Sequence, residues 1–443
     1  MPNVAERPDT ERGTAYHETV EHTVLSSMEK PGLLYWGALA FTASCFALGM
    51  GLWGYQMYKG MGVSGLNNPV GWGVYITDFV FWVGIAHSGT LISAILYLFR
   101  GKFRSSINRS AEAMTVFAVM TAGLFPLIHL GRSWFFFWLL PYPNERLLWV
   151  NFRSPLMWDV FAVSTYLTVS AVFFYVGMIP DFAVAKRFHT GVKKWVYGTL
   201  SLGFTGTFTQ WKHYAKLYMF LAAFATPLVI SVHSVVSWDF AMSVIPGWHT
   251  TIFAPYFVAG AIFSGTAMVI TLVVPMRKIF KLERIITIDH FESLGKLILL
   301  TSVIVGYSYI VEFALAVYSG NDFEAGAFLY RAVGDYRWLY YMMLACNMFI
   351  PLTLFVKKWR RSIAFLYIVS IFVNIGMWLE RFVIIVSSLS NDFNPYSWGL
   401  YRPGFVEAGI TLGSFGFFMT LFLLFTKFLP VIAISEIKEV ADE

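Results

Sequence analysis

Four ionisable side chains lie in apolar stretches of the sequence at positions suited to binding and deprotonating a redox substrate. Asp78 and His129 fall within two such stretches, Asp159 lies near the start of a third, and Arg132 follows His129 by three residues. Ionisable groups inside apolar segments are costly and usually functional. A histidine and an aspartate near the two hydroxyls of a quinol can accept the protons that leave on oxidation. We interpret these residues as a quinol-binding and proton-accepting group, with Arg132 keeping Asp78 or Asp159 ionised.

A second set of polar residues has two open interpretations, a proton path or structural pairing between helices. Its members are His87, His233, Asp239, Glu312, Glu380, Arg381, Asp289 and His290. Adjacent helical residues point about 100° apart, so we expect Glu380 and Arg381 to pair with other helices. Arg132 and Asp239 have the further alternative of reaching interfacial water, and Asp159 that of complementing a helix dipole.

The amino-acid composition indicates that these residues lie in a lipid bilayer. The 443 residues are 57% hydrophobic and 13% charged, about half the charged content of a soluble protein. A helix needs ~20 apolar residues to cross the hydrocarbon. We predict an all-α polytopic membrane protein whose ten spans are 33–58, 72–99, 112–134, 155–178, 217–239, 251–275, 289–317, 336–356, 363–388 and 410–430.

Basic residues orient these spans. The loops on one side hold eighteen Lys and Arg, and those on the other hold five. Such residues concentrate in cytoplasmic loops, so we expect both termini inside a bacterial cytoplasmic membrane. The net charge of +6 is spread over short loops, which argues against nucleic acid. The first thirty residues lack an apolar signal-peptide core, and we expect them to be retained.

A short repeat suggests an internal duplication. Residues 84–90 read GIAHSGT and residues 260–266 read GAIFSGT in the same register, with His87 replaced by Phe263. Four helices separate the copies, so both run in the same direction. We predict two four-helix bundles and this organisation: cytoplasmic tail 1–32, flanking helix 33–58, quinol-binding bundle 72–239, second bundle 251–388, flanking helix 410–430 and cytoplasmic tail 431–443.

Redox metals are expected elsewhere than in this chain. It has two cysteines, Cys45 and Cys346, and no CxxCH motif or cysteine cluster. We therefore predict no haem, iron–sulfur cluster or metal here, and we expect any such centre in a partner chain.

Several of these residues carry a family resemblance. The chain resembles the NrfD/polysulfide-reductase membrane subunits, and within them the ActC subunit of bacterial alternative complex III, with the paralogous ActF subunit as the alternative. The residues that carry the resemblance are Thr77-Asp78-Phe79 through His87-Ser88-Gly89, His129-Leu-Gly-Arg132, Trp158-Asp159 and Gly376-Met-Trp-Leu-Glu380-Arg381-Phe382.

The resemblance implies a substrate and partners. Menaquinol or ubiquinol would bind near the outer face, at positions matching Asp78, His129 and Asp159, and its protons would leave to the outside. Electrons would pass to an iron–sulfur subunit docked outside, then to multihaem cytochrome c subunits and a terminal cytochrome oxidase. A paralogous NrfD-like subunit would stand beside this chain in the lipid.

Two other classes stay open. A secondary transporter or proton carrier would fit the duplication and the embedded acids, although such carriers more often have inverted repeats and broken helices. A b-type cytochrome would need two histidines to clamp a haem, and His129 with His233 is the candidate pair.

Overall fold

The chain forms a multi-pass bundle of membrane-spanning helices. The computed structural model describes residues 32–98, 106–141 and 154–434, together with Val24, Leu25, Met28 and Phe152. These residues form helices and no β-strand. Ten of the helices are long and apolar enough to cross a bilayer, which confirms the predicted all-α polytopic fold. The predicted tail 1–32 falls almost entirely outside the described residues, as does 435–443 of the second tail.

The ten spans follow one another along the chain. They are α2 (Leu33–Lys59), α3 with its π-helical end (Val74–Ala94), α5 (Asn108–His129), α6 (Pro155–Phe188), α8 (Phe208–Ala241), α9 (Phe253–Ile279), α10 (Ile288–Tyr318), the broken span Arg337–Phe355, α15 with its π-helical end (Ile363–Ser390) and α17 (Phe405–Phe428). Shorter helices lie between them: η5 (Ser133–Leu139), α7 (Gly191–Leu200) and α11 (Asp322–Val333).

Helices α5, α6 and α8 have ends that differ from the prediction. The third span is predicted at 112–134, but α5 begins at Asn108 and ends at His129. Gly131 follows with φ 69°, a left-handed conformation that terminates helices and that glycine adopts without strain. Helices α6 and α8 extend beyond the predicted spans at their basic ends, each having 34 residues. A helix can continue past the hydrocarbon into a charged stretch, because its backbone hydrogen bonds are made within the helix whatever side chains it carries.

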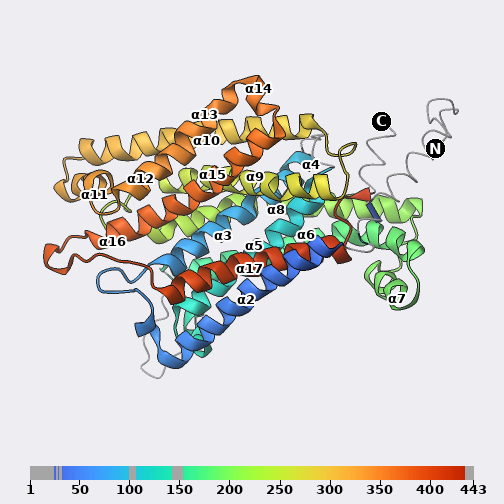
Figure 1. Cartoon of the computed structure of the whole chain (residues 1–443), viewed down its shortest axis with the longest axis horizontal. Helices are drawn as coiled ribbons and strands as arrows, with labels where there is room; N and C mark the ends of the chain where they lie inside the picture. The colour runs from blue at the N-terminus through green and yellow to red at the C-terminus, as the bar shows by residue number, and fades with distance from the viewer. Residues whose placement is uncertain are drawn as a thin grey trace.

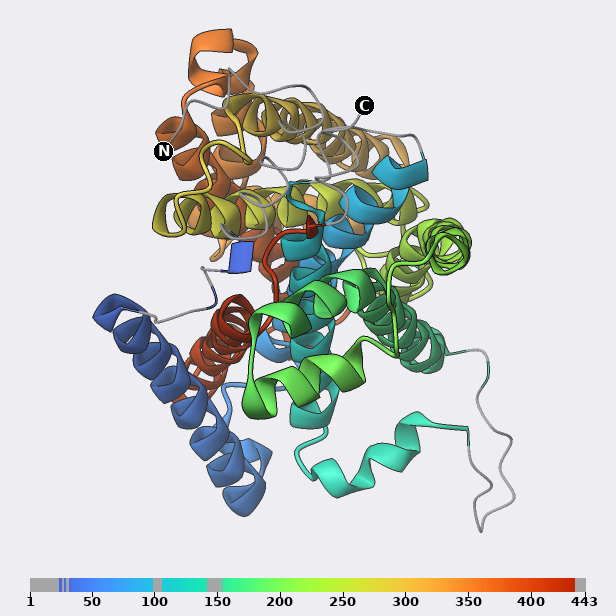
Figure 2. The same cartoon turned by 90° about the vertical axis from the view of Figure 1, so that its right-hand side faces the viewer.

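Helix α3 lies at the centre of the bundle, and nearly all of its residues are buried. Helix α3 packs against α5, α8 and α9. Helix α6 packs against α5 and α8 on the outside of this group. On the other side of α3, α9 contacts α10 and α15. Helices α2 and α17 pair along one flank (Figures 1 and 2). We propose that residues 72–239 and 251–388 are the two halves of a duplicated unit around the α3–α9 contact.

The repeated motif supplies the small residues of that central contact. A Cβ atom at Gly265 of α9 would lie 2.5 Å from the Cβ of Ser88 and 2.7 Å from the carbonyl oxygen of Ile85. The hydroxyl of Ser88 donates to the carbonyl oxygen of Ile262 at 2.7 Å. Small residues let membrane helices approach closely, and hydroxyls link them across the interface.

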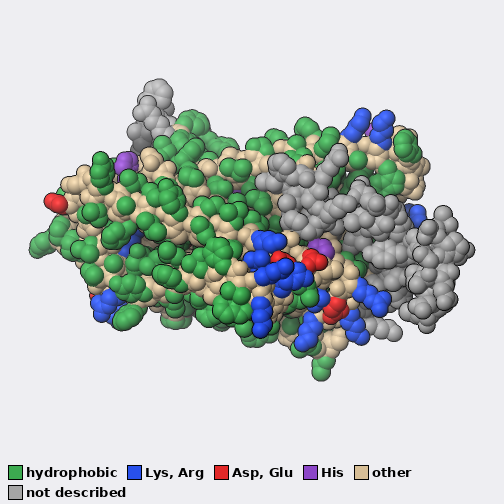
Figure 3. Space-filling view, turned by 90° about the horizontal axis from the view of Figure 1, so that it is seen from above, with side chains coloured by type: hydrophobic (Ala, Val, Ile, Leu, Met, Phe, Trp, Pro, Cys, Tyr) green, Lys and Arg blue, Asp and Glu red, His purple; other side chains and the backbone are tan. Residues whose placement is uncertain are grey.

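The surface carries the predicted charge asymmetry. Lys and Arg side chains gather mainly toward the end of the molecule where α7 lies, while most of the visible lateral surface is hydrophobic (Figures 1 and 3). We call this basic end inner and the opposite end outer. An apolar band with basic residues at one end is typical of a bilayer protein whose basic end faces the cytoplasm.

Candidate functional site

Two aspartates meet at the outer ends of α6 and α8. The carboxylates of Asp159 and Asp239 lie within interaction distance of each other, and Asp159 is buried. The rings of Trp158 and Trp238, the residues before each aspartate, pack edge to face with centroids 6.0 Å apart. Apart from the Asp239 carboxyl, no group of a described residue donates a hydrogen bond to either carboxylate oxygen of Asp159. Two ionised carboxylates repel at short range, so this pair is a natural acceptor for a proton.

A pair of histidines lies deeper in the bundle, where α8 meets α3. His87 of α3 and His233 of α8 are both buried, with ring centroids 4.5 Å apart. The Nδ1 atom of His87 is 2.6 Å from the carbonyl oxygen of Val83. Neither ring nitrogen of His233 has a hydrogen-bond partner among the described residues. The structure thus places His233 beside His87 and Phe257.

The ring of Phe257 lies between the histidines and a second polar group in the other half of the chain. The guanidinium of Arg381 lies 4.9 Å from the ring centroid of Phe257, whose ring is beside His233. Arg381 forms an ion pair with Glu380, and Glu380 accepts a hydrogen bond from Tyr309 of α10. Arg381 therefore has its ion pair within its own helix, although its guanidinium also lies against Phe257 of α9. Glu380 does reach a second helix through Tyr309.

Glu312 of α10 lines a cavity at the outer side. The cavity has a volume of about 540 Å³ and is also lined by Trp238, His249 and Glu324. The Oε1 atom of Glu312 has no hydrogen-bond partner among the described residues. Trp238 belongs to this cavity and also packs edge to face on Trp158, the neighbour of Asp159. The cavity and the acid pair are therefore adjacent through one side chain.

The predicted four-residue cluster is divided in the structure. Asp78 accepts hydrogen bonds from Nε1 of Trp378 at 2.7 Å and from Oγ1 of Thr411 at 2.6 Å. It therefore faces α15 and α17, away from the Asp159 pair. His129 is the last residue of α5 and is half-buried. The expectation that Arg132 shares a helical face with His129 is wrong, because the helix ends before it.

Asp289 and His290 stand apart from the other polar residues. They lie in the first turn of α10, 23 and 22 residues before Glu312, which is roughly 35 Å along a helix. Asp289 forms an ion pair with Arg361 at 3.0 Å. His290 caps the helix through Nδ1, which lies 2.8 Å from Oγ1 of Thr287. The ion pair of Asp289 and the helix cap of His290 give both residues a structural role at the inner end of α10.

One buried cluster of charged residues was not predicted from the sequence. Arg109 contacts Glu112 at 2.8 Å and Asp181 at 3.0 Å, and Tyr218 donates to Glu112 at 2.8 Å. These residues join α5, α6 and α8 near their inner ends. The predicted span begins at residue 112 and leaves Arg109 in a loop. The three-residue spacing of Arg109 and Glu112, a helical neighbour distance, was the available signal.

Metal ligands are not assembled in the part of the chain described. No group of three or more His, Cys, Asp and Glu side chains that could hold a metal ion occurs among the described residues. Cys45 and Cys346 are both free thiols.

Comparison with known proteins adds the family. The family profile described as "Polysulphide reductase, NrfD" matches residues 62–391. This range is most of the chain and includes every candidate polar residue from Asp78 to Arg381. The chain belongs to the NrfD family. The match covers α3 through α15, so the central helices, the acid pair, the histidine pair and the Glu380–Arg381 pair all lie within the part that matches the family profile.

Three named proteins are similar in sequence to this NrfD-family chain. One, from Halobacterium salinarum, is named as a membrane subunit of a dimethyl sulfoxide reductase and is 28% identical over 63% of this chain and 59% of its own length. Another, named as a subunit of the selenate reductase of Mesobacillus selenatarsenatis, is 23% identical over 90% and 94% of the two lengths. An Hdr-like menaquinol oxidoreductase integral membrane subunit of Archaeoglobus fulgidus is 24% identical over 37% and 39%.

Proposed function

We propose that this NrfD-family chain binds and oxidises quinol as the membrane subunit of a respiratory oxidoreductase complex. The proposal is supported by the family and by relatives named as subunits of a menaquinol oxidoreductase and of two reductases. The observation that carries it is the pair Asp159 and Asp239 at the outer ends of two spans, where Asp159 is buried, Asp239 is half-buried, and the Asp159 oxygens have no described partner besides the Asp239 carboxyl. Ionisable groups inside a membrane span are costly and are typical of functional sites.

The chemistry assigned to the pair is proton acceptance. Oxidation of a quinol to a quinone releases two protons and two electrons. Asp159 accepts one proton from a hydroxyl and shares it with Asp239, and His129 at the end of α5 is the proposed partner of the other hydroxyl. The electrons leave to an iron–sulfur centre on a subunit docked outside. Menaquinol and ubiquinol meet these requirements equally.

Asp78 and Arg132 have a supporting place in this proposal. Asp78 links α3 to α15 and α17 through its two hydrogen bonds, which fixes the outer end of α3. Arg132 lies in the turn after α5 and next to η5, whose Trp134 and Phe136 are exposed. Aromatic rings at such a place suit the membrane interface or a quinone tail.

We propose a proton route through the deeper polar residues. It runs from Asp239 past His233 and His87 to Arg381 and Glu380, and Glu312 opens on the outer cavity. Buried ionisable residues that line up between helices are typical of proton relays. Asp289 and His290 have no part in this route.

A more specific proposal concerns the complex in which this chain is a subunit. An ActC-type role would place the chain in the bacterial cytoplasmic membrane, both termini inside, beside an ActF-type paralogue and multihaem cytochrome c subunits. The relatives named for dimethyl sulfoxide and selenate reductases favour a different catalytic partner. Affinity purification of the tagged chain separates the two, because haem c staining of a co-purifying protein supports the ActC-type role and its absence contradicts it.

The acid pair is tested by replacing Asp159 and Asp239 singly with Asn in the intact complex. Loss of a positioned proton acceptor should lower quinol-dependent reduction of the acceptor ~100-fold, with complex assembly unchanged. Thr168→Ala on the exposed face of α6 is the matched control. Full activity in both Asn variants would contradict the assignment.

A further inference from the structure

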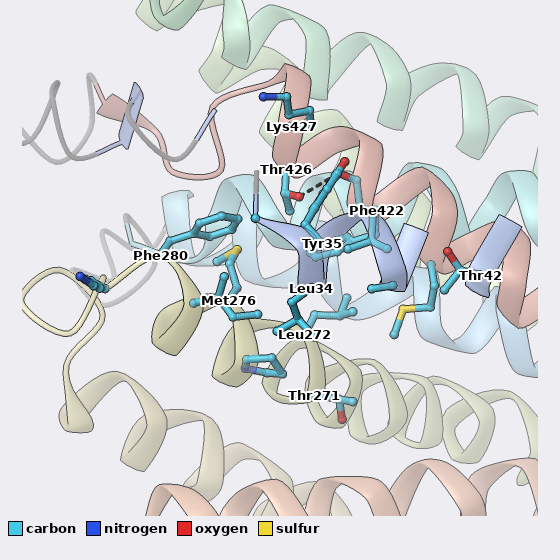
Figure 4. A pocket seen from close by; sticks show the side chains of 17 residues that line it. Leu34, Tyr35, Thr42, Thr271, Leu272, Met276, Phe280, Phe422, Thr426 and Lys427 are labelled. Atoms are coloured by element: carbon cyan, nitrogen blue, oxygen red, sulfur yellow. Dashed lines mark hydrogen bonds between the residues drawn. The ribbon is translucent and has the colours of Figure 1, made fainter. Parts of the chain in front are cut away.

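An apolar crevice opens on the lateral surface between α2, α9 and α17, on the inner side of the bundle. Its volume is about 540 Å³, within the range of ligand pockets, ~300–1,000 Å³. Apolar side chains of all three helices form its walls, and Figure 4 shows several of them together: Leu34, Leu272, Met276 and Phe422. The crevice is separate from the acid pair and from the outer cavity.

Helix packing explains why the crevice exists. Helices α2 and α17 touch at Gly49 and Gly413, where a Cβ on Gly49 would lie 2.6 Å from the Cα of Gly413. Toward the inner side, larger side chains separate the two helices, and the hydroxyl of Tyr35 reaches the carbonyl oxygen of Leu423 at 2.9 Å. The space between this contact and α9 is the crevice.

The polar atoms within the crevice are occupied by the protein itself. Thr42 donates to the carbonyl of Leu39 at 3.2 Å, and Thr271 to that of Ala267 at 2.9 Å. Thr426 donates to the same Leu423 carbonyl as Tyr35, at 2.8 Å. These hydroxyl hydrogens are not available to a polar ligand, so the interior suits a hydrocarbon chain rather than a sugar or a nucleotide.

Basic residues surround the inner mouth. Lys281 and Lys427 both line the crevice. Lys281 is exposed and follows the end of α9 with φ 55°, beside Arg277 and Lys278 in the last turn of that helix. The ammonium of Lys427 donates to the carbonyl of Met28 at 2.6 Å, which holds its positive charge at the mouth. Basic pockets between spans on the cytoplasmic side recognise anionic lipid head groups.

We propose that this crevice binds one anionic phospholipid. An acyl chain lies between α2 and α9 along Leu34, Ala38 and Leu272, and the phosphate lies at Lys281 and Lys427. An apolar interior joined to a cationic mouth matches both parts of such a molecule. A neutral phospholipid or a quinone would use the interior alone and leave the basic mouth unexplained.

Native mass spectrometry of the full-length chain in detergent tests this. Delipidated protein is titrated with phosphatidylglycerol and, separately, with phosphatidylcholine. We expect one tightly retained phosphatidylglycerol and weaker retention of phosphatidylcholine. Lys281→Gln combined with Lys427→Gln should raise the apparent Kd for phosphatidylglycerol about tenfold, and Lys358→Gln, a basic residue outside the crevice, should not.

A steric variant distinguishes the crevice from the rest of the lipid-facing surface. Ala38→Trp fills the crevice and should abolish the retained lipid, whereas Gly37→Trp, on the neighbouring exposed position with open space around it, should keep it. A melting temperature close to that of the wild type shows that each variant is folded. Equal retention in Ala38→Trp and Gly37→Trp, no preference for the anionic lipid, or a retained quinone in place of lipid would overturn the proposal.

Discussion

The imidazole rings of His87 and His233 lie with their centroids 4.5 Å apart, buried where α3 meets α8. His87 has one nitrogen next to its own helix backbone, while both nitrogens of His233 lack a partner among the described residues. Imidazole is a side chain suited to proton transfer near neutral pH. In the proposed route these two rings are the step between the outer acid pair and the Glu380–Arg381 pair.

His87→Phe should separate folding from proton transfer. The repeat carries Phe263 at the matching position of α9, so a phenyl ring suits this register in this kind of helix. We expect normal membrane insertion and a ~10-fold or greater loss of quinol-driven proton movement in proteoliposomes. His213→Phe, at the exposed inner end of α8, is the control. Wild-type proton movement in His87→Phe would remove these histidines from the route.

The Glu380–Arg381 pair should show strong coupling in a double-mutant cycle. Both residues are buried. Glu380→Gln leaves the Arg381 guanidinium without its acid and should lower the free energy of unfolding by ~3–5 kcal/mol. Adding Arg381→Met removes the stranded charge and should restore part of that loss. Thermal unfolding of the solubilised protein measures both, and additive effects of the two substitutions would contradict the pairing.

The central α3–α9 contact should not tolerate a side chain at Gly265. A Cβ there meets Ser88 and the backbone of Ile85 below 3.0 Å, so Gly265→Val forces the helices apart at a cost of ~1–3 kcal/mol. Gly123→Val on α5 is the matched control, because nothing lies within 4 Å of its Cβ position. The amount of folded protein in membranes measures the difference. Equal amounts for the two variants would show that the contact is looser than described.

Orientation is testable with single cysteines. After Cys45→Ala and Cys346→Ala, a cysteine replacing Tyr396, a fully exposed residue of the outer helix η9 (Pro395–Ser397), should react with an impermeant maleimide in spheroplasts. A cysteine replacing Val192 of α7 should react only after the membrane is opened. The reverse pattern would invert the assigned orientation.

Hydropathy and loop charge predicted the fold because the bilayer imposes span length and apolarity on every helix. The partners of buried polar groups were beyond the reach of the sequence. Asp78 meets Trp378 and Thr411, which are 300 and 333 residues away, and only the packing of α15 and α17 on α3 reveals this. Arg132 was misplaced because the left-handed turn at Gly131 ends the helix before it.

Asp159 and Asp239 were identified separately, as a quinol ligand and as a proton carrier, but not as a pair. Each lies near the outer end of its own span, and 80 residues of chain separate them. Their meeting depends on α6 and α8 running antiparallel and in contact, which span lengths alone do not specify. The same applies to Arg109, whose partner Asp181 lies on the next helix.

Photo-crosslinking with an azidoquinone tests the central claim most directly. Purified complex is illuminated with the probe, with and without excess quinol, and labelled peptides of this chain are mapped by mass spectrometry. We expect quinol-protected labelling at the outer ends of α6 and α8, around Trp158 and Trp238, which is lost in Asp159→Asn and kept in Thr168→Ala. Labelling confined to other helices, or equal labelling in Asp159→Asn, would contradict a quinol site at the acid pair.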